Sequence, residues 1–399
     1  MKQEWKLASF DTFCLGMVNK GAWIYAQAPD FTKMKAALNV IAGMYPQLGG
    51  LYDEKKKALV WDDAAATEPA FEVVDLLKYS TADLIGKPSL AWSLVPAYNI
   101  NEFKEGGRRP FLAHLGYLKD GAILYVQCAH ATMDGKSFYS LMNQWAELYK
   151  GGEPEPMTVN QDLLPSDSGF TKEETMVKIL ENGWVRMTVG KMIKMMWQLV
   201  RNNSAKGSFA IDVSQEEIAR LKAESGSGMN AVLAAITMKR LAERLPKRES
   251  FKMLFVADLR GLYPGVDETF FGNFSQPFAV KGDFSVSESI PALAAAIQAG
   301  AREAVDSGKA IENTRLSLCS GKYSLPYFYF DPSDTSSRNP GTIYINNQLK
   351  FRACELDWGN GLPLYAFPNE LPDMVKFWEP VAGGPVQLIF GGVTAKLFR

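Results

Sequence analysis

The stretch His130-Ala-Thr-Met-Asp134-Gly135 lies between two segments with different hydrophobic periodicities, and these segments decide the fold class. Before it, Phe111 to Leu118 and Ala122 to His130 (AILYVQCAH) are apolar runs joined by the turn Lys119-Asp120-Gly121, so they predict a buried β-hairpin. After it, Lys136 to Tyr149 (KSFYSLMNQWAELY) places its apolar residues along one helical stripe. A strand, a short loop and a helix in this order predict an α/β protein.

His130 and Asp134 are the side chains in this stretch that can carry chemistry. A histidine at the end of a strand can face a cavity, and a neutral imidazole is well matched to removing a proton near pH 7. The aspartate falls in the turn or first helical turn that follows, where the helix dipole favours an acid. Taken alone, the pattern also fits a core histidine followed by an Asp-Gly turn, so both interpretations stay open at this point.

Further helix and strand signals occur on both sides of this stretch. Phe31 to Met44 carries apolar residues at helical spacing and predicts a helix. In the second half, Phe209 to Val213 (FAIDV) predicts a strand. Ser214, with Glu217 three residues later, predicts a capping box that opens the next helix, and Val232 to Leu245 predicts another. We therefore expect an N-terminal domain over residues 1–152 and a C-terminal domain over residues 208–399.

The connection between these domains, residues 153–207, has a different character. A polar, proline-bearing stretch precedes a long helical pattern from Glu173 to Val200 that is rich in Met and Trp. One interpretation is a crossover helix that packs over the domain junction. Because Met and Trp alternate with Lys and Arg, a lid or an interfacial helix that meets a lipid-like chain is the other interpretation.

The composition narrows the classes of function. A chain of 399 residues suits two domains of about 200 residues each. Lys and Arg number 43 against 44 Asp and Glu, so the net charge of −1 argues against a dedicated nucleic-acid binder. The charged N-terminus and the lack of an apolar run of about 18 residues predict a cytosolic protein with no stable membrane span. Four widely separated cysteines predict buried thiols in a reducing compartment: Cys14, Cys128, Cys319 and Cys354.

Motifs at several places along the chain give a more specific indication. In order, they are Ala8-Ser-Phe-Asp11, Tyr45-Pro-Gln-Leu-Gly49-Gly50, the His130–Gly135 stretch, Asp258-Leu-Arg260 with Phe271-Gly272-Asn273, and Asp357-Trp358-Gly359-Asn360-Gly361. With these motifs, in this order and spacing, the sequence resembles the BAHD acyltransferases, which belong to the wider superfamily of chloramphenicol acetyltransferase-like enzymes. The last motif departs from the family pattern Asp-Phe-Gly-Trp-Gly, because Trp358 replaces Phe and Asn360 replaces Trp.

The resemblance implies a fold of two chloramphenicol acetyltransferase-like domains. Each would be a mixed β-sheet with flanking helices, and the active-site channel would lie at their interface. It also implies a monomeric acyltransferase of secondary metabolism that moves an acyl group from a CoA thioester to a hydroxyl or amine of a small-molecule acceptor. Acyl-CoA would be a co-substrate, and neither a resident cofactor nor a metal is expected.

The resemblance also implies roles for single residues. His130 would be the general base. Asp134 would pair with Arg260 and fix the loop that carries His130, while Asp357 would hold a turn. Glycines of the same motifs would shape the backbone of the site: Gly135, Gly359 and Gly361. An oxyanion donor would come from Thr342 to Phe351, and the candidates for oxyanion or channel contacts are Asn346, Asn347, Asn360 and Trp358.

Alternatives remain open for the donor and for the second histidine. A condensation-type enzyme of the same superfamily would take its acyl group from a carrier protein, and a non-catalytic binding protein could share the fold. In the predicted hairpin, residues whose numbers sum to about 240 face each other, so His114 would oppose Val126. His114 would then lie roughly 13 Å from His130, too far to share a metal, and we expect it to be a packed residue.

Overall fold

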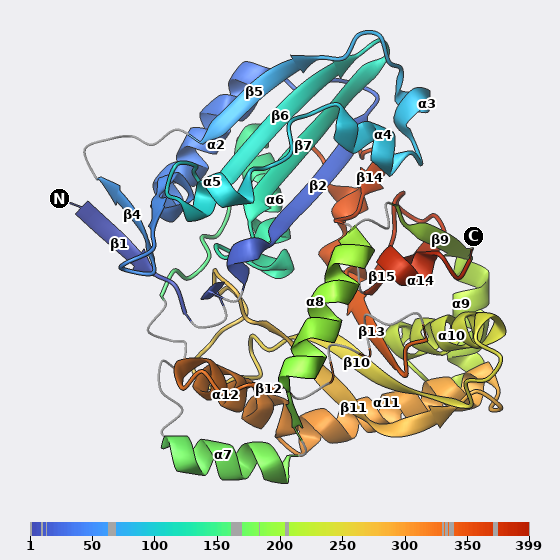
Figure 1. The fold of residues 1–399 in the computed structure, drawn as a ribbon. Helices are drawn as coiled ribbons and strands as arrows, with labels where there is room; N and C mark the ends of the chain where they lie inside the picture. The colour runs from blue at the N-terminus through green and yellow to red at the C-terminus, as the bar shows by residue number, and fades with distance from the viewer. Residues whose placement is uncertain are drawn as a thin grey trace.

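The chain forms two α/β domains, one above the other in Figure 1. The structure is a computed structural model, and it describes residues 2–8, 11–12, 14–62, 69–160, 170–182, 184–203, 207–328, 331, 334, 339–369 and 374–398. Each domain is built on a mixed β-sheet with flanking helices, as predicted. Each sheet has its own hydrophobic core.

The N-terminal sheet has the strand order β14-β2-β7-β6-β5. Its strands are β2 (Val18–Tyr25), β5 (Ala70–Asp75), β6 (Phe111–Leu118), β7 (Gly121–Ala129) and β14 (Tyr365–Phe367). Helices α2 (Phe31–Met44) and α6 (Gly135–Lys150) cover one face, and α3 (Thr81–Leu84) and α4 (Pro88–Ser93) cover the other. A small sheet of β1 (Lys2–Lys6), β4 (Ala58–Asp62) and β3 (Leu51–Asp53) adjoins the domain, and α5 is Ile100–Lys104.

The C-terminal sheet has the strand order β11-β10-β13-β15-β16-β9. These strands are β9 (Phe209–Val213), β10 (Ser250–Asp258), β11 (Ser275–Ser285), β13 (Thr342–Asn347), β15 (Val375–Trp378) and β16 (Val386–Phe390). One face packs on α9 (Gln215–Ser225), α10 (Met229–Arg244) and α11 (Ile290–Asp306). Two further helices are α12 (Lys309–Lys322) and α14 (Gly392–Ala395). The opposite face is directed towards the N-terminal domain.

One strand crosses between the domains. Strand β14 comes late in the chain, yet it pairs with β2 in the N-terminal sheet (Figure 1). The segment before it packs into the N-terminal core, where Trp23 Nε1 donates to the backbone oxygen of Ala353 at 2.9 Å. Tyr25 likewise donates to the backbone oxygen of Leu356 at 3.0 Å. The sequence-based limits 1–152 and 208–399 stay a prediction, and residues 353–367 are the part that joins the other domain's sheet.

The hairpin before His130 is present, but its register is one residue from the prediction. Gly121 pairs with Leu118, so the turn has two residues instead of three, and Asp120 in that turn accepts hydrogen bonds from Thr81. His114 therefore faces Tyr125 and not Val126. The prediction was wrong because the sequence assigned Gly121 to the turn, whereas its backbone already belongs to β7.

The predicted single helix from Glu173 to Val200 is wrong. Two helices, α7 (Lys172–Glu181) and α8 (Val189–Asn203), flank a short strand, β8 (Val185–Arg186), which pairs with β12 (Tyr327–Phe328). Trp184 and Met187 on either side of β8 are buried. These apolar residues pack beside α12 and β12, so a continuous helix would carry them away from their partners.

The cysteines and the helix lengths can be compared directly with the sequence. All four cysteines are free and buried, as predicted. Within the described ranges, no helix combines the length and apolar character that crossing a membrane requires.

Candidate active site

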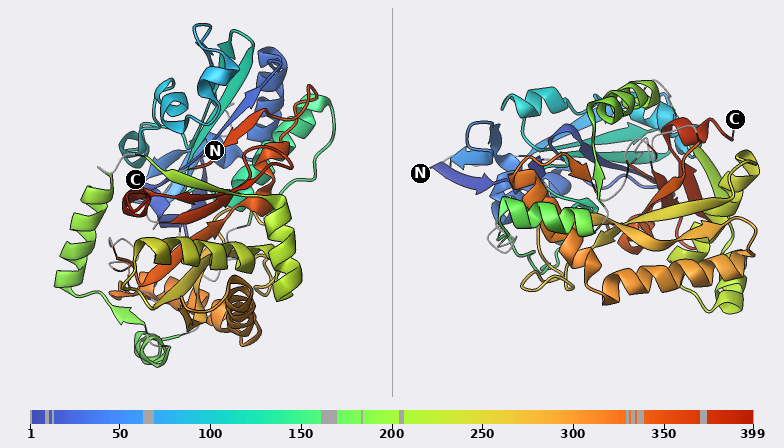
Figure 2. Two further views of the ribbon diagram at one scale, coloured as in Figure 1. Left: turned by 90° about the vertical axis from the view of Figure 1, so that its right-hand side faces the viewer. Right: turned by 60° about the horizontal axis from the view of Figure 1, so that its bottom comes forward.

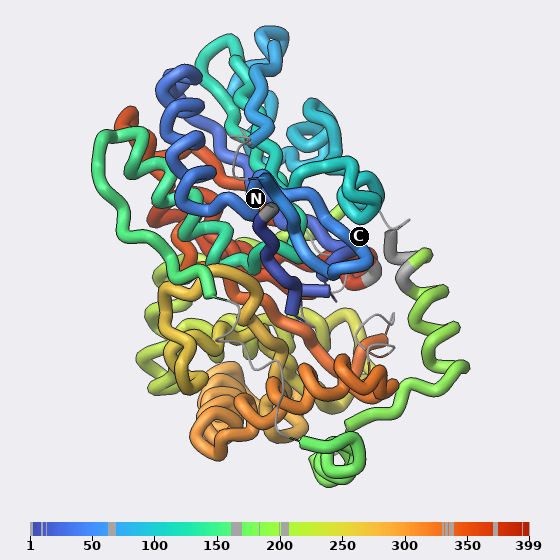
Figure 3. Tube along the Cα trace, turned by 90° about the vertical axis from the view of Figure 1, so that its left-hand side faces the viewer, coloured from blue at the N-terminus to red at the C-terminus, as the bar shows by residue number. Residues whose placement is uncertain are grey.

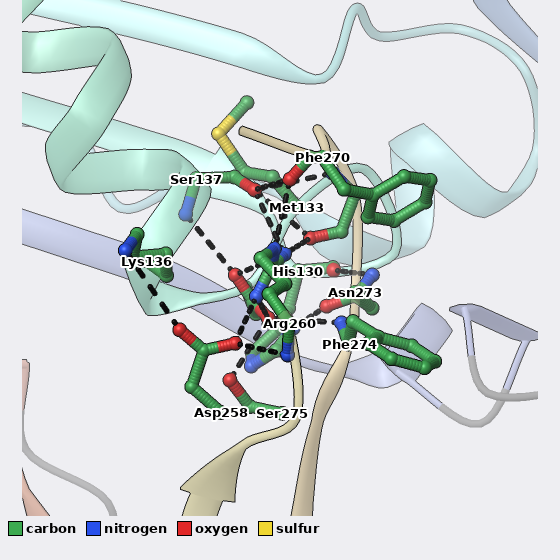
Figure 4. A network of polar contacts seen from close by, with 12 residues as sticks. His130, Met133, Lys136, Ser137, Asp258, Arg260, Phe270, Asn273, Phe274 and Ser275 are labelled. Carbon is green, nitrogen blue, oxygen red and sulfur yellow. Dashed lines mark hydrogen bonds and ion pairs between the residues drawn. The ribbon is translucent and has the colours of Figure 1, made fainter. Parts of the chain in front are cut away.

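The loop from His130 to Gly135 connects β7 to α6 and is anchored on the start of β2 and the residue before it. The backbone N–H of His130 donates to the oxygen of Met17 at 2.9 Å, and Asn19 Nδ2 donates to the oxygen of Met133 at 2.7 Å. The side chain of Met133 is buried in the N-terminal core. These contacts fix the backbone and leave the His130 ring directed towards the C-terminal domain, as Figure 4 shows.

The His130 ring contacts Asn273 of the C-terminal domain, with Nδ1 3.0 Å from Oδ1. Asn273 Nδ2 donates to Asp11 Oδ1 and to the backbone oxygen of His130, each at 2.8 Å. Because the Asp11 carboxylate accepts hydrogen bonds, it fixes the orientation of the Asn273 amide. Asn273 Oδ1 is then an acceptor, so the hydrogen of the neutral His130 ring sits on Nδ1. The lone pair on Nε2 remains available to take a proton.

The surroundings of His130 favour its neutral form. Burial is the largest effect and lowers the pKa of His130 from its ordinary value of 6.5. A hydrogen bond with its own backbone, the charge of Asp134 and the bond to Asn273 act in the opposite direction, whereas the nearby Lys376 lowers the pKa further. The net direction is downward, so the ring is unprotonated at pH 7, as a general base must be.

Asp134 and Arg260 form a buried ion pair that joins the two domains (Figure 4). Arg260 Nη1 donates to Asp134 Oδ2 at 2.9 Å and Nη2 donates to Oδ1 at 3.1 Å, a two-point contact that fixes both groups. Asp134 also accepts hydrogen bonds from the backbone N–H groups of Ser137 and Phe274 and from the Ser275 hydroxyl. The pairing expected from the family resemblance is therefore present.

The remaining donors of Arg260 complete the network. Its Nε donates to the backbone oxygen of Phe270 at 2.8 Å, and Nη2 donates to that of Gly272 at 2.8 Å. Nη1 also contacts Asp258 Oδ1 at 2.9 Å. Because the guanidinium binds both the Asp134 loop and the 270–272 backbone, it sets the position of Asn273 relative to His130.

Asp134 is charged in this network. Burial alone would raise its pKa, but the Arg260 guanidinium and the backbone donors outweigh burial and bring the pKa of Asp134 down to about 2. Asp134 is also the N-cap of α6, and its carboxylate accepts from the N–H of Ser137 at 3.1 Å. Its carboxylate thus links the loop that carries His130 to the start of α6 and to the backbone at Phe274.

Gly135 allows α6 to lie close to Phe351, and its φ angle is not positive. A Cβ at this position would lie 3.0 Å from Cε2 of Phe351, which comes from the C-terminal half of the chain. That spacing is tighter than ordinary carbon contacts. The glycine therefore lets α6 begin directly against the segment that follows β13.

The C-terminal sheet presents polar side chains on the face opposite its helix-covered core. Ile345 and Phe377 point into that core, so their neighbours Asn346 and Lys376, which pair in adjacent strands, share the other face. Lys376 is buried and near enough to His130 to lower its pKa. Asn347 instead donates to Asn230 on α10 at 3.4 Å. Of the two predicted oxyanion candidates, Asn346 is on the inter-domain face and Asn347 is not.

The motif from Asp357 to Gly361 is a turn that is stabilised by hydrogen bonds within the motif. Asp357 Oδ1 accepts from the N–H of Gly359 at 2.7 Å and of Gly361 at 3.0 Å. The glycines have φ angles of +87° and +102°, which L side chains rarely adopt. A Cβ on Gly359 would touch Lys150, the last residue of α6. Since α6 has 16 residues, this turn lies about 20 Å from the His130 end of that helix.

Two residues of this motif, Trp358 and Asn360, were predicted to contact the oxyanion or the channel, and the structure shows their surroundings. Trp358 is buried in the N-terminal core, edge-on to Trp145, and its Nε1 donates to the Tyr25 hydroxyl at 3.0 Å. Asn360 is exposed in the turn. Trp358 is therefore a packing residue, because its indole fills a cavity among other aromatic rings.

Asp11 and Asn273 belong to two of the sequence motifs, but the sequence alone indicates no role for them at the site. Only their meeting with His130 shows what they do, since they are separated by more than half of the chain. Lys376 was missed altogether, and its signal in the sequence is a single charge within an apolar strand, VKFW. Among the residues that the structure describes, no group of His, Cys, Asp and Glu could hold a metal ion.

The chain was compared with protein families and with curated sequences. Residues 65–374 match the family model described as the Transferase family, which is the BAHD acyltransferase family. The chain belongs to this family, and it is an acyltransferase. A comparison with curated protein sequences found no match.

Solved structures share the fold at low sequence identity. TRI101 of F. graminearum complexed with ethyl coenzyme A is 13% identical with a TM-score of 0.72, covering 99% of this chain and 96% of that one. Vinorine synthase is 15% identical with a TM-score of 0.67, covering 98% and 91%. The first condensation domain of the calcium-dependent antibiotic synthetase is 12% identical with a TM-score of 0.63, covering 98% and 91%. The two-domain, chloramphenicol acetyltransferase-like fold is thus shared across all three.

Proposed function

We propose that this acyltransferase uses acyl-CoA as its donor and a small-molecule alcohol or amine as its acceptor, with His130 as the general base. The observation that carries the proposal is the chain of contacts from Asp11 through Asn273 to His130 Nδ1. It leaves Nε2 of a neutral imidazole as the proton acceptor. The coenzyme A bound to the structurally similar TRI101 supports a CoA thioester as donor.

In the proposed reaction, His130 Nε2 takes the proton of the acceptor hydroxyl or amine as that group attacks the thioester carbonyl. The carbonyl carbon becomes tetrahedral, and its oxygen gains the negative charge. Asn346, on the inter-domain face of β13, is our candidate donor to this oxyanion. When the carbon–sulfur bond breaks, the thiolate of CoA leaves and takes the proton from His130, which restores the neutral ring.

The experiment that tests this proposal measures free thiol release with a panel of acyl-CoAs and acceptors. For a donor and acceptor that react, His130→Ala should lower turnover by about 10²–10⁴-fold, the usual contribution of a positioned base. His114→Gln is the matched control, because His114 is a buried histidine of the same domain that contacts Glu72 at 3.8 Å. Near-normal turnover of His130→Ala would refute the role of His130 as base.

A second candidate donor is an acyl group on a carrier protein. The observation that favours it is the shared fold with a condensation domain. The same assay separates the two, because a carrier-dependent enzyme would be inactive with every free acyl-CoA and active with a loaded carrier. We propose further that the protein acts as a cytosolic monomer, since one chain supplies both domains of the site; light scattering of the purified protein tests the monomer.

A further inference from the structure

Helix α8 (Val189–Asn203) carries its apolar side chains on the outside of the molecule. Its large apolar residues with high exposure are Val189 at 73%, Met192 at 48%, Ile193 at 65%, Met196 at 57%, Trp197 at 62% and Val200 at 67%. With about 100° between successive residues, these six positions fall within one arc of roughly 140°. They form a single apolar stripe along the helix, which we name the α8 stripe.

The polar side of α8 is turned towards the protein. Gln198, opposite the middle of the stripe, is only 3% exposed. Lys191, on the same side as Gln198, makes an ion pair of 2.8 Å with Asp331. The helix stands at the edge of the molecule in Figures 2 and 3, and α14 packs against it.

This orientation is the reverse of the usual one. A surface helix of a globular protein directs its apolar stripe to the core and its polar side to water. An exposed stripe of this length is an unfavourable surface in water, and such patches mark sites of interaction. The exposed residues of the α8 stripe therefore mark a candidate interaction surface.

The charge of α8 selects the kind of occupant. Its sequence, VGKMIKMMWQLVRNN, contains three basic residues and no acidic one, although the whole chain has a net charge of −1. Lys191 is already paired with Asp331, so among the described side chains of the helix Lys194 is the exposed cation that can act here. Lys194 is exposed beside the α8 stripe. Pairing two copies of α8 would bring like charges together, whereas a surface of anionic phospholipids would attract them. Basic residues flanking Trp and aliphatic side chains are the composition of helices that lie in a membrane interface.

We propose that α8 is an interfacial helix that binds the surface of an anionic phospholipid bilayer. The α8 stripe enters the boundary between headgroups and acyl chains, with Trp197 at the level where indole rings are favoured. Lys194 lies about 60° around the helix from Trp197 at the edge of the stripe, and its long side chain extends from there to lipid phosphates. This binding does not depend on the reaction proposed above, so it is measured without acyl-CoA or acceptor.

The experiment is co-sedimentation of the full chain with two kinds of vesicle. One is phosphatidylcholine alone, and the other is phosphatidylcholine with about 30% phosphatidylserine, which resembles an anionic natural membrane. We expect binding to the anionic vesicles and weak binding to the neutral ones. The double variant Ile193→Ser with Met196→Ser should lose about tenfold or more in partitioning, because two of the inserted side chains become polar. Lys194→Glu should lose about 20-fold on anionic vesicles, since it changes two units of charge near the surface.

The matched control is Val177→Ser with Leu180→Ser on α7, which are 55% and 57% exposed on a helix that holds three glutamates. These changes remove comparable exposed apolar surface and should leave vesicle binding unchanged. All variants alter exposed side chains, and circular dichroism with thermal melting verifies that they fold.

Three results would overturn the proposal. The first is no binding of the folded wild-type chain to either vesicle. The second is equal loss of binding in the α7 and α8 variants, or no loss in either. The third is a wild-type dimer that Ile193→Ser with Met196→Ser converts to a monomer, which would make a second copy the occupant of the α8 stripe.

Discussion

The His130–Gly135 loop and the Asp357–Gly361 turn were both singled out by their resemblance to family motifs, but they keep their shapes in different ways. The loop depends on the other domain, since Arg260 holds Asp134 and Asn273 holds His130. The turn depends on itself, because its own aspartate accepts from the N–H groups of its two glycines. The shape of the His130–Gly135 loop therefore depends on the interface between the domains. The shape of the Asp357–Gly361 turn depends only on hydrogen bonds within the turn.

The comparison predicts the largest effect for the ion pair that joins the domains. Asp134→Asn or Arg260→Met should each lower the free energy of unfolding by about 3–5 kcal/mol, because each removes the two-point contact from a buried charge, and Asp258 offers Arg260 only one contact in its place. Turnover should fall as well, since the loop that carries His130 loses its anchor. Denaturant unfolding monitored by fluorescence, together with the thiol-release assay, measures both.

The double variant of Asp134 and Arg260 sharpens this prediction. If the two residues act as a pair, the combined loss should be clearly smaller than the sum of the single losses. The control is Arg220→Met, which breaks the exposed pair with Glu224 and should change stability by about 0.5 kcal/mol or less. Additive losses at Asp134 and Arg260 would contradict the pairing.

The second prediction concerns the pH dependence that the loop gives to the reaction. Because burial lowers the pKa of His130, the acidic limb of the kcat/KM profile should lie below pH 6.5, and activity should be lost as the pH falls through it. Asn273→Ala removes a bond that raises this pKa, so the limb should move to lower pH. Turnover should drop by about tenfold, the value of one lost hydrogen bond that orients the ring.

Steady-state kinetics from about pH 4.5 to about pH 8 covers the ordinary pKa of histidine on both sides. The profile gives the position of the acidic limb and the turnover. A limb well above pH 6.5 in the wild-type enzyme would mean that the titrating group is not the buried His130. A limb that stays in place in Asn273→Ala would mean that Asn273 does not contact the reacting ring.

Local elements could be predicted from the sequence because their signals are local. The apolar runs around the turn at Lys119 predicted β6 and β7 to within one residue, and the stripe from Lys136 to Tyr149 predicted α6. The break between α7 and α8 was missed, because Trp184 and Met187 continue a helical periodicity while they pack on residues more than a hundred positions away.

The candidate site was only partly predictable for the same reason. The resemblance to family motifs predicted His130 as the base and Asp134 as the partner of Arg260; the ion pair is present, and the role of His130 stays a prediction. The tautomer of His130 follows from the contact between Asp11 and Asn273. These two residues are 262 positions apart in the sequence, and hydrophobic periodicity predicts only local structure. Trp358 was a candidate for channel contacts because it lies in the stretch that resembles the last family motif, but its side chain is buried in the N-terminal core.

The third prediction tests the self-contained turn. Asp357→Ala removes the acceptor of two backbone N–H groups and should lower the free energy of unfolding by about 1–3 kcal/mol. Turnover at saturating substrates should stay near the wild-type value, because the turn lies about 20 Å from the loop along α6. Thermal unfolding and the thiol-release assay separate the two effects. A catalytic loss as large as that of the Asp134 variant, at unchanged stability, would contradict the comparison.

The smallest effect is expected at Asn360, where the family pattern has Trp. Its side chain is exposed, and its backbone is outside the left-handed region that Gly359 and Gly361 occupy among the described residues. Asn360→Ala should therefore change neither stability, beyond about 0.5 kcal/mol, nor turnover. Gly361→Ala in the same turn is the matched comparison, since its φ of +102° makes a side chain strained, and it should cost about 1–3 kcal/mol. If Asn360→Ala instead abolished turnover at unchanged stability, the exposed end of this turn would have to reach the reacting groups. The turn would then take part in catalysis like the His130–Gly135 loop, and the contrast between the loop and the turn would be wrong.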